Sequence, residues 1–419
     1  MSAPDAARAI DAVWRIESPR LVAALARMVR DVGLAEDLAH DALVAALETW
    51  PRTGIPDRPG AWLMTAAKRR AIDELRRRRM AEPKHAALGR ELDELHAAAP
   101  APGDTLDDEI GDDLLRLVFV ACHPVLPTEQ RVALTLRLLG GLTTPEIARA
   151  FLATEPAIQQ RIVRAKRALA DAGVPFEVPA RAEFAPRLAS VLEVVYLVFN
   201  EGYSATAGDD YLRPQLCDDA IRLGRVLAGL LPDEPEVLGL VALMELQASR
   251  LRARTGPDGA VVLLADQDRA RWDALLIRRG LAALDRATAA AAPGPYAVQA
   301  AIAACHARAR TAADTDWARI AALYDALATL VPSPVVELNR AVAHGMASGP
   351  AAGLARADAL RDVPALRRYH LLPAVRGDFL LRLGRRDEAR AEFERAASLT
   401  ANARERELLE RRAAECSGG

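Results

Sequence analysis

The chain has 419 residues, which is too long for one compact core and indicates two or three domains. Its formal net charge is only −2, so the overall charge gives no sign of nucleic-acid binding, and any such surface must be local. The four cysteines lie far apart without a CxxC pair, and no apolar run of membrane-spanning length occurs, which argues against a zinc site, a disulfide framework and a transmembrane segment. Ala, Leu and Arg dominate, so we expect an all-α protein, located in the cytoplasm.

The first predicted helical block extends from about residue 8 to residue 79. Within it, the segment GLAEDLAHDALVAALETW predicts a helix with an acidic edge beside an apolar stripe. The candidate partner-binding residues on this edge are Asp37, His40, Asp41 and Glu48. An acidic edge suits a basic protein partner, but a solvated helix face explains it equally well.

The next segment, PGAWLMTAAKRRAIDELRRRR, predicts a second helix of this block. Its inward stripe consists of Leu63, Ala67, Ala71 and Leu75. Four arginines at its C-terminal end complement the helix dipole and suit a phosphate backbone, although they could also form a solvated helix end. Trp62 could lie in the core or contact an unstacked base. The candidate DNA-binding residues of this helix are Trp62, Lys68, Arg69, Arg76 and Arg77.

Residues 81–104 are polar and rich in Ala and Pro, and they predict a linker. The block that follows, residues 105–173, ends in two short helical patterns separated by three or four residues. In the second pattern, Thr154 is suited to cap the helix and Pro156 is tolerated in its first turn. One narrow stripe must face a core, and it consists of Ile158, Ile162, Ala165 and Leu169.

The outer face of this second helix is rich in Gln and Arg. Its candidate DNA-binding residues are Ala157, Gln160, Arg161, Arg164 and Arg167. Two short helices joined by a tight turn form a helix-turn-helix, whose second helix would enter the major groove of DNA. Arg suits guanine and phosphate, and Gln suits adenine. An ordinary helical hairpin with a basic surface remains the alternative.

The third block, residues 187–416, reads as successive helices broken by Pro and Gly. Near its end, RGDFLLRLGRRDEARAEFERAASLT predicts two helices joined at Gly384, with Ala389, Phe393 and Ala396 on one stripe of the second helix. This spacing is typical of tetratricopeptide-like repeats. The candidate regulatory residues of the block are Asn200, Glu201, Tyr203, Asp266 and Trp272. These could form contact surfaces, or merely a buried polar turn and a capped helix start.

In this order, the segments resemble the extracytoplasmic-function type of the sigma-70 family. RLVAALARMVRD, AEDLAHDALVAALETW and AWLMTAAKRRAIDELRRRR resemble sigma region 2, within residues 1–80. LPTEQRVALTLRLLGGLTTPEIA, with the helix that follows, resembles sigma region 4. The third block, from VLEVVYLVFNEGYSA onward, resembles the long C-terminal extension of one subgroup of these factors.

The resemblance implies that the chain binds core RNA polymerase and promoter DNA. Asp37, His40 and Asp41 fall on positions that contact the β′ clamp helices of the polymerase, and the β flap is the second implied polymerase contact. The helix from Trp62 to Arg79 would read the −10 element, and the helix from Thr154 to Arg167 would read the −35 element.

The favoured interpretation is therefore a sigma factor whose extension modulates its activity, with a regulatory protein as a candidate partner of the extension. One rival is a helix-turn-helix regulator that binds DNA independently of polymerase. A second rival is an enzyme or scaffold built on the helical repeat. We find no nucleophile–His–acid set, no phosphate-cradling Gly loop and no metal-ligand spacing, so neither catalysis, nor a cofactor, nor a metal is expected.

Overall fold

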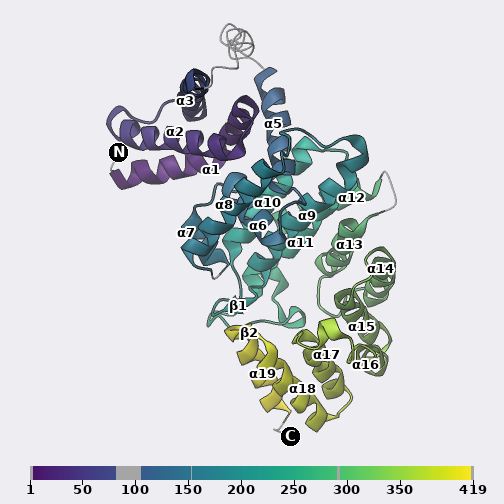
Figure 1. The fold of residues 1–419 in the computed structure, drawn as a ribbon. Coiled ribbons are helices and arrows are strands. Elements are labelled where there is room, and N and C mark those ends of the chain that lie inside the picture. The colour runs from purple at the N-terminus through teal and green to yellow at the C-terminus, as the bar shows by residue number, and fades with distance from the viewer. Residues whose placement is uncertain (1–2, 82–104, 152, 290–292, 417–419) are drawn as a thin grey trace. The chain divides into compact units, whose positions relative to one another are not determined.

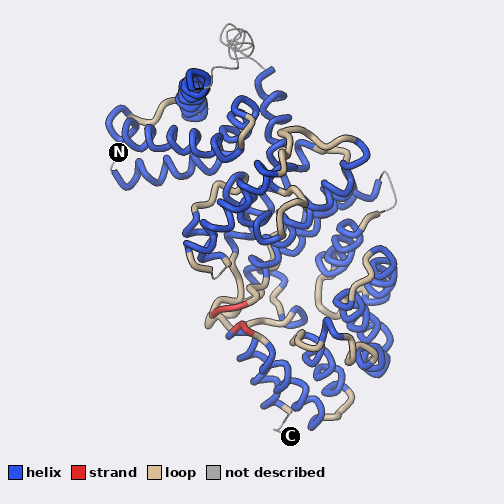
Figure 2. Tube along the Cα trace, in the orientation of Figure 1, coloured by secondary structure: helices blue, strands red, loops and turns tan. Residues whose placement is uncertain are grey.

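A computed structural model describes residues 3–81, 105–151, 153–289 and 293–416 (Figure 1). Nearly all of the predicted linker, residues 82–104, lies outside the described residues. The predicted all-α class is confirmed: Figure 2 shows helices throughout the described chain, with one pair of very short strands. In the part of the chain that the structure describes, no helix has the length and apolar character needed to cross a lipid bilayer. The chain divides into two compact units, residues 1–194 and residues 195–419.

The first unit contains two groups of helices. The longer helices are α1 (Ala3–Val29), α2 (Val32–Thr53) and α3 (Pro59–Ala81). They pack against one another around large, fully buried side chains, among them Leu21, Leu25, Trp50 and Leu63. The shorter helices are α5 (Thr105–Ala121), α6 (Thr128–Leu138), α7 (Thr144–Ala150) and α8 (Glu155–Asp171).

Helix α9 (Arg181–Tyr203) begins in the first unit and ends in the second. Its first part is fixed to the shorter helices. The Ser190 hydroxyl donates a hydrogen bond to the carbonyl oxygen of Cys122 at 2.7 Å and accepts one from Arg131 at 2.5 Å. The Arg187 guanidinium donates to the carbonyl oxygen of Phe119 at 2.8 Å. The start of α9 is therefore part of the first unit's core.

The second unit is built from helices that pack on their neighbours in sequence. Its α-helices after α9 are α10 (Pro214–Leu230), α11 (Pro235–Ala248), α12 (Ala274–Ala289), α13 (Pro295–Arg308), α14 (Trp317–Leu330), α15 (Pro334–Ser348), α16 (Pro350–Asp358), α17 (Leu371–Arg382), α18 (Arg386–Leu399) and α19 (Ala403–Glu415). Short 3-10 turns occur at η1 (Leu251–Ala253), η2 (Leu264–Asp266), η3 (Arg269–Arg271) and η4 (Pro364–Leu366). The predicted helical character of this block is confirmed, and its assignment to the tetratricopeptide type stays a prediction.

The predicted helix pair near the C-terminus is α17 and α18. Gly384 joins them with a φ of 76°, a left-handed conformation that favours glycine. Ala389, Phe393 and Ala396 are buried as the stripe predicted, because they pack against α17 and α19.

The beginning and the end of the second unit meet. Strand β1 (Ala207–Gly208) pairs in parallel with strand β2 (Ala401–Asn402). The fully buried Asn402 donates from its amide nitrogen to the carbonyl oxygens of Ala205 and Asp210, at 3.0 Å each. Its amide oxygen accepts from the backbone at the start of α19, which caps that helix.

Candidate nucleic-acid and partner interfaces

Helix α8 starts and packs as its sequence predicts. Thr154 is the N-cap, and its hydroxyl accepts a hydrogen bond from the backbone nitrogen of Ala157 at 3.4 Å. The predicted apolar stripe is buried in full, and it consists of Ile158, Ile162, Ala165 and Leu169. Burying this stripe on one side leaves the opposite side of the helix toward solvent. Together with α7, α8 forms the helix–turn–helix arrangement that the sequence predicts.

The side chains on the outer face of α8 differ in exposure and in whether they already have a partner. Gln160 and Arg164 are exposed, and neither has a hydrogen-bond or ion-pair partner among the described residues. Arg161 is half-buried and forms an ion pair of 2.8 Å with Glu129 on α6. Arg167 is exposed and lies 3.5 Å from Asp171. Ala157, at the start of the helix, is half-buried.

Helix α3 presents the predicted cationic groups. Leu63, Ala67 and Ala71 are buried, whereas Leu75 is only half-buried. The side chains of Arg69 and Arg76 are exposed, Lys68 is half-buried, and within the described part of the chain no carboxylate pairs with any of the three.

Two of the predicted DNA-binding residues on α3, Arg77 and Trp62, already contact other side chains of the protein. Arg77 and Arg78 both bind Glu74, and the Arg78–Glu74 distance is 2.8 Å. Hydrogen bonding from Arg78 lowers the pKa of the Glu74 carboxyl. Trp62 is half-buried, and its ring packs edge-on against the buried Trp50 with centroids 5.4 Å apart. One edge of Trp62 therefore belongs to the core of this helical group.

The acidic edge of α2 is on the surface. Its four predicted members, Asp37, His40, Asp41 and Glu48, are all exposed. The His40 ring contacts Trp14 of α1 edge-on at 6.1 Å. Asp31 caps the start of the helix by accepting from the backbone nitrogen of Leu34 at 3.1 Å.

Glu36, a residue outside the predicted acidic set, joins this edge to the short helices. Its carboxylate binds Arg137 of α6 at 2.5 Å and Lys166 of α8 at 2.6 Å. Burial alone would raise the pKa of the Glu36 carboxyl, but Lys166 and Arg137 outweigh burial and hold the pKa below its usual value. The Lys166 ammonium also lies 3.8 Å from Asp37, on the acidic edge itself.

A cavity of about 330 Å³ lies at this contact. Its walls include Asp37, His40 and Asp41 from the acidic edge and Gln159 and Val163 from α8. A further ion pair, between Arg15 of α1 and Glu146 of α7, joins the same two helical groups. The predicted partner-binding edge and the predicted DNA-reading helix thus lie against each other.

Comparison with known families agrees with this architecture. The model named "Sigma-70 region 2" matches residues 14–80, and the model named "Sigma-70, region 4" matches residues 116–169. A probable ECF RNA polymerase sigma factor, SigI of Mycobacterium tuberculosis, is 30% identical over 38% of this chain and 53% of its own length. The ECF RNA polymerase sigma factor SigK of Mycobacterium ulcerans is 30% identical over 36% of this chain and 78% of its own length.

This chain belongs to the extracytoplasmic-function group of the sigma-70 family. Region 2 corresponds to α1–α3, and region 4 lies within α5–α8. The chain spans about half the length of SigI, and that likeness covers 161 residues.

The sigma factor carries a further segment beyond region 4. Residues 187–288 match a family of unknown function, DUF6596. An uncharacterised protein of Rhizobium meliloti is 48% identical over 92% of this chain and 91% of its own length, so it shares the whole arrangement.

In this extension of the sigma factor, two of the predicted regulatory residues meet around one arginine. Arg250 donates a hydrogen bond to the Tyr203 hydroxyl and lies over the Trp272 ring, 5.8 Å from its centroid. Glu201 instead binds Arg213, and Asp266 is exposed on η2. No sequence pattern marks Arg250 for this role, because its partners come from distant parts of the chain.

Proposed function

We propose that this chain is a sigma factor that binds core RNA polymerase and directs transcription initiation at promoters with defined −10 and −35 elements. The observation that supports it most is the face of α8 formed by Gln160 and Arg164. These side chains are exposed, have no partner in the described chain, and lie opposite a fully buried stripe on a capped helix. Arg and Gln are suited to hydrogen bonding with base edges in the major groove.

Helix α3 is proposed to contact the −10 element. Arg69 and Arg76 supply exposed positive charge for phosphates, and the accessible part of Trp62 supplies an aromatic surface for an unstacked base. Arg77 would first have to leave Glu74, so its contribution should be smaller.

The acidic edge formed by Asp37, His40, Asp41 and Glu48 is proposed to bind the β′ clamp helices, and region 4 is proposed to contact the β flap. Because Lys166 and Arg137 bind Glu36 beside this edge, we infer that the two sigma regions separate when polymerase binds. Polymerase would then compete with an internal contact, and promoter reading would follow from that opening.

The extension is proposed to modulate this activity, with a regulatory protein as a candidate partner. The clustering of Tyr203, Trp272 and Arg250 within one fold supports a functional surface in the extension.

In vitro transcription on a promoter library tests the proposal. Core RNA polymerase with the full-length protein should start RNA at defined sites, and polymerase without the protein should not. If the protein fails to join core polymerase, or joins it without producing a defined start site, the proposal is wrong. A gel-shift assay without polymerase distinguishes a sigma factor from a regulator that binds DNA independently of polymerase. The regulator would bind promoter duplex tightly by itself.

A further inference from the structure

The second unit contains a partly open cavity of about 720 Å³ that belongs to neither sigma region. Its size is within the range of small-molecule sites. One wall is formed by the segment from Val261 to Ala265, and another by apolar side chains of α15, α17 and α19. The buried rings of Phe379 and Phe393 add aromatic surface to its lining.

The charges in this cavity are unbalanced. Five guanidinium groups line it, against the two carboxylates of Asp378 and Glu405. The Asp378 carboxylate forms ion pairs with the guanidinium groups of Arg382 and Arg412, each with an N–O distance of 2.8 Å. Glu405 accepts from the Thr400 hydroxyl at 2.8 Å and lies 3.1 Å from the His370 ring nitrogen. The remaining three guanidinium groups belong to Arg250, Arg254 and Arg269, and none of them forms an ion pair with a carboxylate in the described part of the chain. Arg254 is nevertheless close enough to Glu405 for the two charges to interact.

Aromatic rings and neutral oxygens hold these three arginines in place. Arg254 lies over the Tyr203 ring at 3.7 Å from its centroid and donates to the Tyr211 hydroxyl at 2.6 Å. Arg269 lies over the Trp272 ring at 4.6 Å and donates to the backbone carbonyl oxygens of His306 and Ala309. Such contacts orient a guanidinium without neutralising it, so its charge stays available to an anion.

Two buried polar atoms at the cavity wall lack a partner. Arg254 is only 7% exposed, and its Nε has no hydrogen-bond acceptor. Gln267 is 8% exposed, and its Oε1 has no donor, although its Nε2 donates to the carbonyl oxygen of Val262. A buried donor without an acceptor is costly, so the Arg254 Nε points to a ligand with an acceptor atom, as an oxyanion has.

The neighbouring histidine reflects the same positive environment. Burial, with the charges of Arg250 and Arg269, lowers the pKa of His306 to about 4. His306 is therefore neutral at physiological pH and adds no charge of its own.

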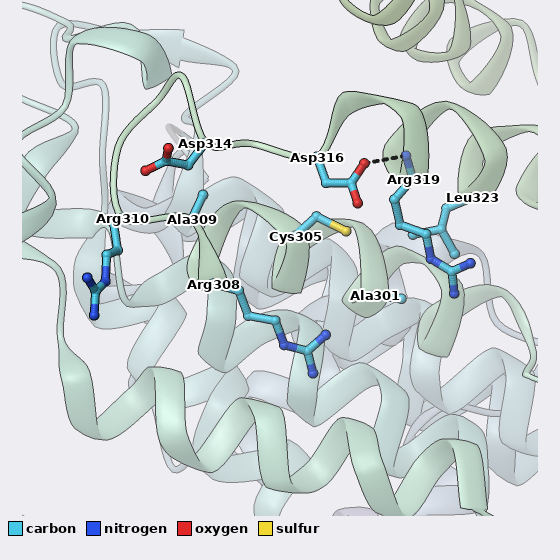
Figure 3. A pocket seen from close by; sticks show the side chains of 9 residues that line it. All are labelled: Ala301, Cys305, Arg308, Ala309, Arg310, Asp314, Asp316, Arg319 and Leu323. Carbon is cyan, nitrogen blue, oxygen red and sulfur yellow. Dashed lines mark hydrogen bonds between the residues drawn. The ribbon is translucent and has the colours of Figure 1, made fainter.

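A second hollow, at the end of α13, shows a different arrangement (Figure 3). Its arginines are exposed, and Figure 3 shows Arg310 and Arg319 well apart. Asp316 is used as the cap of α14, accepting from the backbone nitrogen of Arg319 at 2.8 Å. Asp314 accepts from the backbone and the hydroxyl of Thr311. This hollow lacks buried, unpartnered groups, within the described residues, and carries no inference.

We propose that the cavity at Arg250, Arg254 and Arg269 binds a small amphipathic molecule with an oxyanion head group. The three guanidinium groups bind the carboxylate or phosphate head, and the apolar walls cover its body. The extension is thereby a small-molecule binding domain, whether or not the chain acts in transcription.

Isothermal titration calorimetry on the full-length protein tests the proposal with three probes: octanoate, octyl phosphate and octan-1-ol. At least one anion should bind at least tenfold more tightly than the uncharged alcohol. The comparison of octanoate with octyl phosphate identifies which head group the site prefers. Equal binding of all three probes, or no binding of either anion, would overturn the proposal.

Two variants locate the site. Arg254→Met should weaken binding of the preferred anion at least tenfold and change binding of octan-1-ol by less than threefold. Arg278→Gln also removes an arginine from this unit, but its exposed side chain on α12 does not line the cavity, so binding should stay the same. Arg254→Lys keeps the charge but loses the planar fork, and an intermediate affinity is expected. If Arg254→Met folds poorly by circular dichroism, the comparison of anion with alcohol in the unmodified protein still decides the question.

Discussion

Arg161 and Arg164 lie on the same helix, yet their surroundings differ. Arg164 is exposed without a partner in the described chain, whereas Arg161 is bound to Glu129 at 2.8 Å. We expect Arg164→Ala to lower output about 5- to 150-fold at promoters whose −35 element it reads, because one specific base contact contributes about 1–3 kcal/mol. Arg161→Ala should cost less, since that side chain must leave Glu129 before it contacts DNA. Single-round transcription with core polymerase on −35 variants measures both effects.

Glu129→Gln provides the matched control for this comparison. This substitution removes the ion pair without changing α8. In a protein that carries Glu129→Gln, Arg161→Ala should therefore lower transcription output by a larger factor than it does in the unmodified protein. Equal losses for Arg161→Ala and Arg164→Ala in the unmodified protein would contradict the assigned difference.

Local features of α8 could be predicted from the sequence because neighbouring residues determine them. The cap at Thr154 and the stripe from Ile158 to Leu169 depend only on spacing along one helix. The pairing of Arg161 could not be predicted, because Glu129 lies on another helix and any exposed carboxylate of the chain was an equal candidate. The roles assigned to the exposed residues remain predictions.

At the scale of elements, the contact between α2 and α8 predicts competition with polymerase. Lys166→Gln removes the ammonium that lies 2.6 Å from Glu36 and leaves the acidic edge itself unchanged. A partly buried ion pair stabilises the internal contact by about 1 kcal/mol. Its loss should therefore strengthen binding to core polymerase about fivefold. Arg164→Gln is the control, because it removes one positive charge from the same helix outside the contact. Weaker binding of the Lys166 variant, measured without DNA by fluorescence anisotropy, would exclude this competition.

The stabilisation that this contact contributes should be lost at low pH. Lys166 and Arg137 hold the pKa of Glu36 below its usual value of 4.5 despite burial, so the stabilisation is complete above that value. It is lost as the pH falls through the lowered pKa, when the carboxylate is protonated in the folded state. The difference in free energy of unfolding between the unmodified protein and Lys166→Gln should be constant from about pH 5 to 8 and shrink below about pH 4. Urea unfolding at several pH values measures it, and a difference that grows on acidification would contradict the ion pair.

The sequence predicted the helices but not which of them meet. Glu36 stands in a run of acidic and apolar residues that has no feature marking a partner on α8. The cluster at Arg250, Arg254 and Tyr203 could not be predicted for a related reason: Tyr203 is the last residue of α9, whereas Arg250 and Arg254 lie directly before and after η1. Such contacts depend on tertiary packing, which periodicity along one helix does not contain.

At the scale of the whole molecule, the extension begins inside the core of region 4. Arg187 and Ser190, on the first part of α9, bind the backbone at Phe119 and Cys122. The sequence placed the start of the third block near residue 187, from its Pro-rich approach, and could not show that these residues serve region 4. The residue at which the chain is truncated therefore decides whether the truncation removes the extension alone or also contacts that hold region 4.

Two truncations separate these roles. A chain ending at residue 186 loses the hydrogen bonds of Arg187 and Ser190, each worth about 1 kcal/mol, and its sigma regions should unfold at a temperature several degrees below those of a chain ending at residue 203. The longer truncation keeps α9 whole, so it should retain polymerase binding while promoter output changes from that of the full-length protein. Thermal unfolding and in vitro transcription, run in parallel, give both readouts. Because the chain ending at residue 203 keeps every α9 contact with region 4, promoter output equal to the full-length protein would mean that the extension does not modulate initiation.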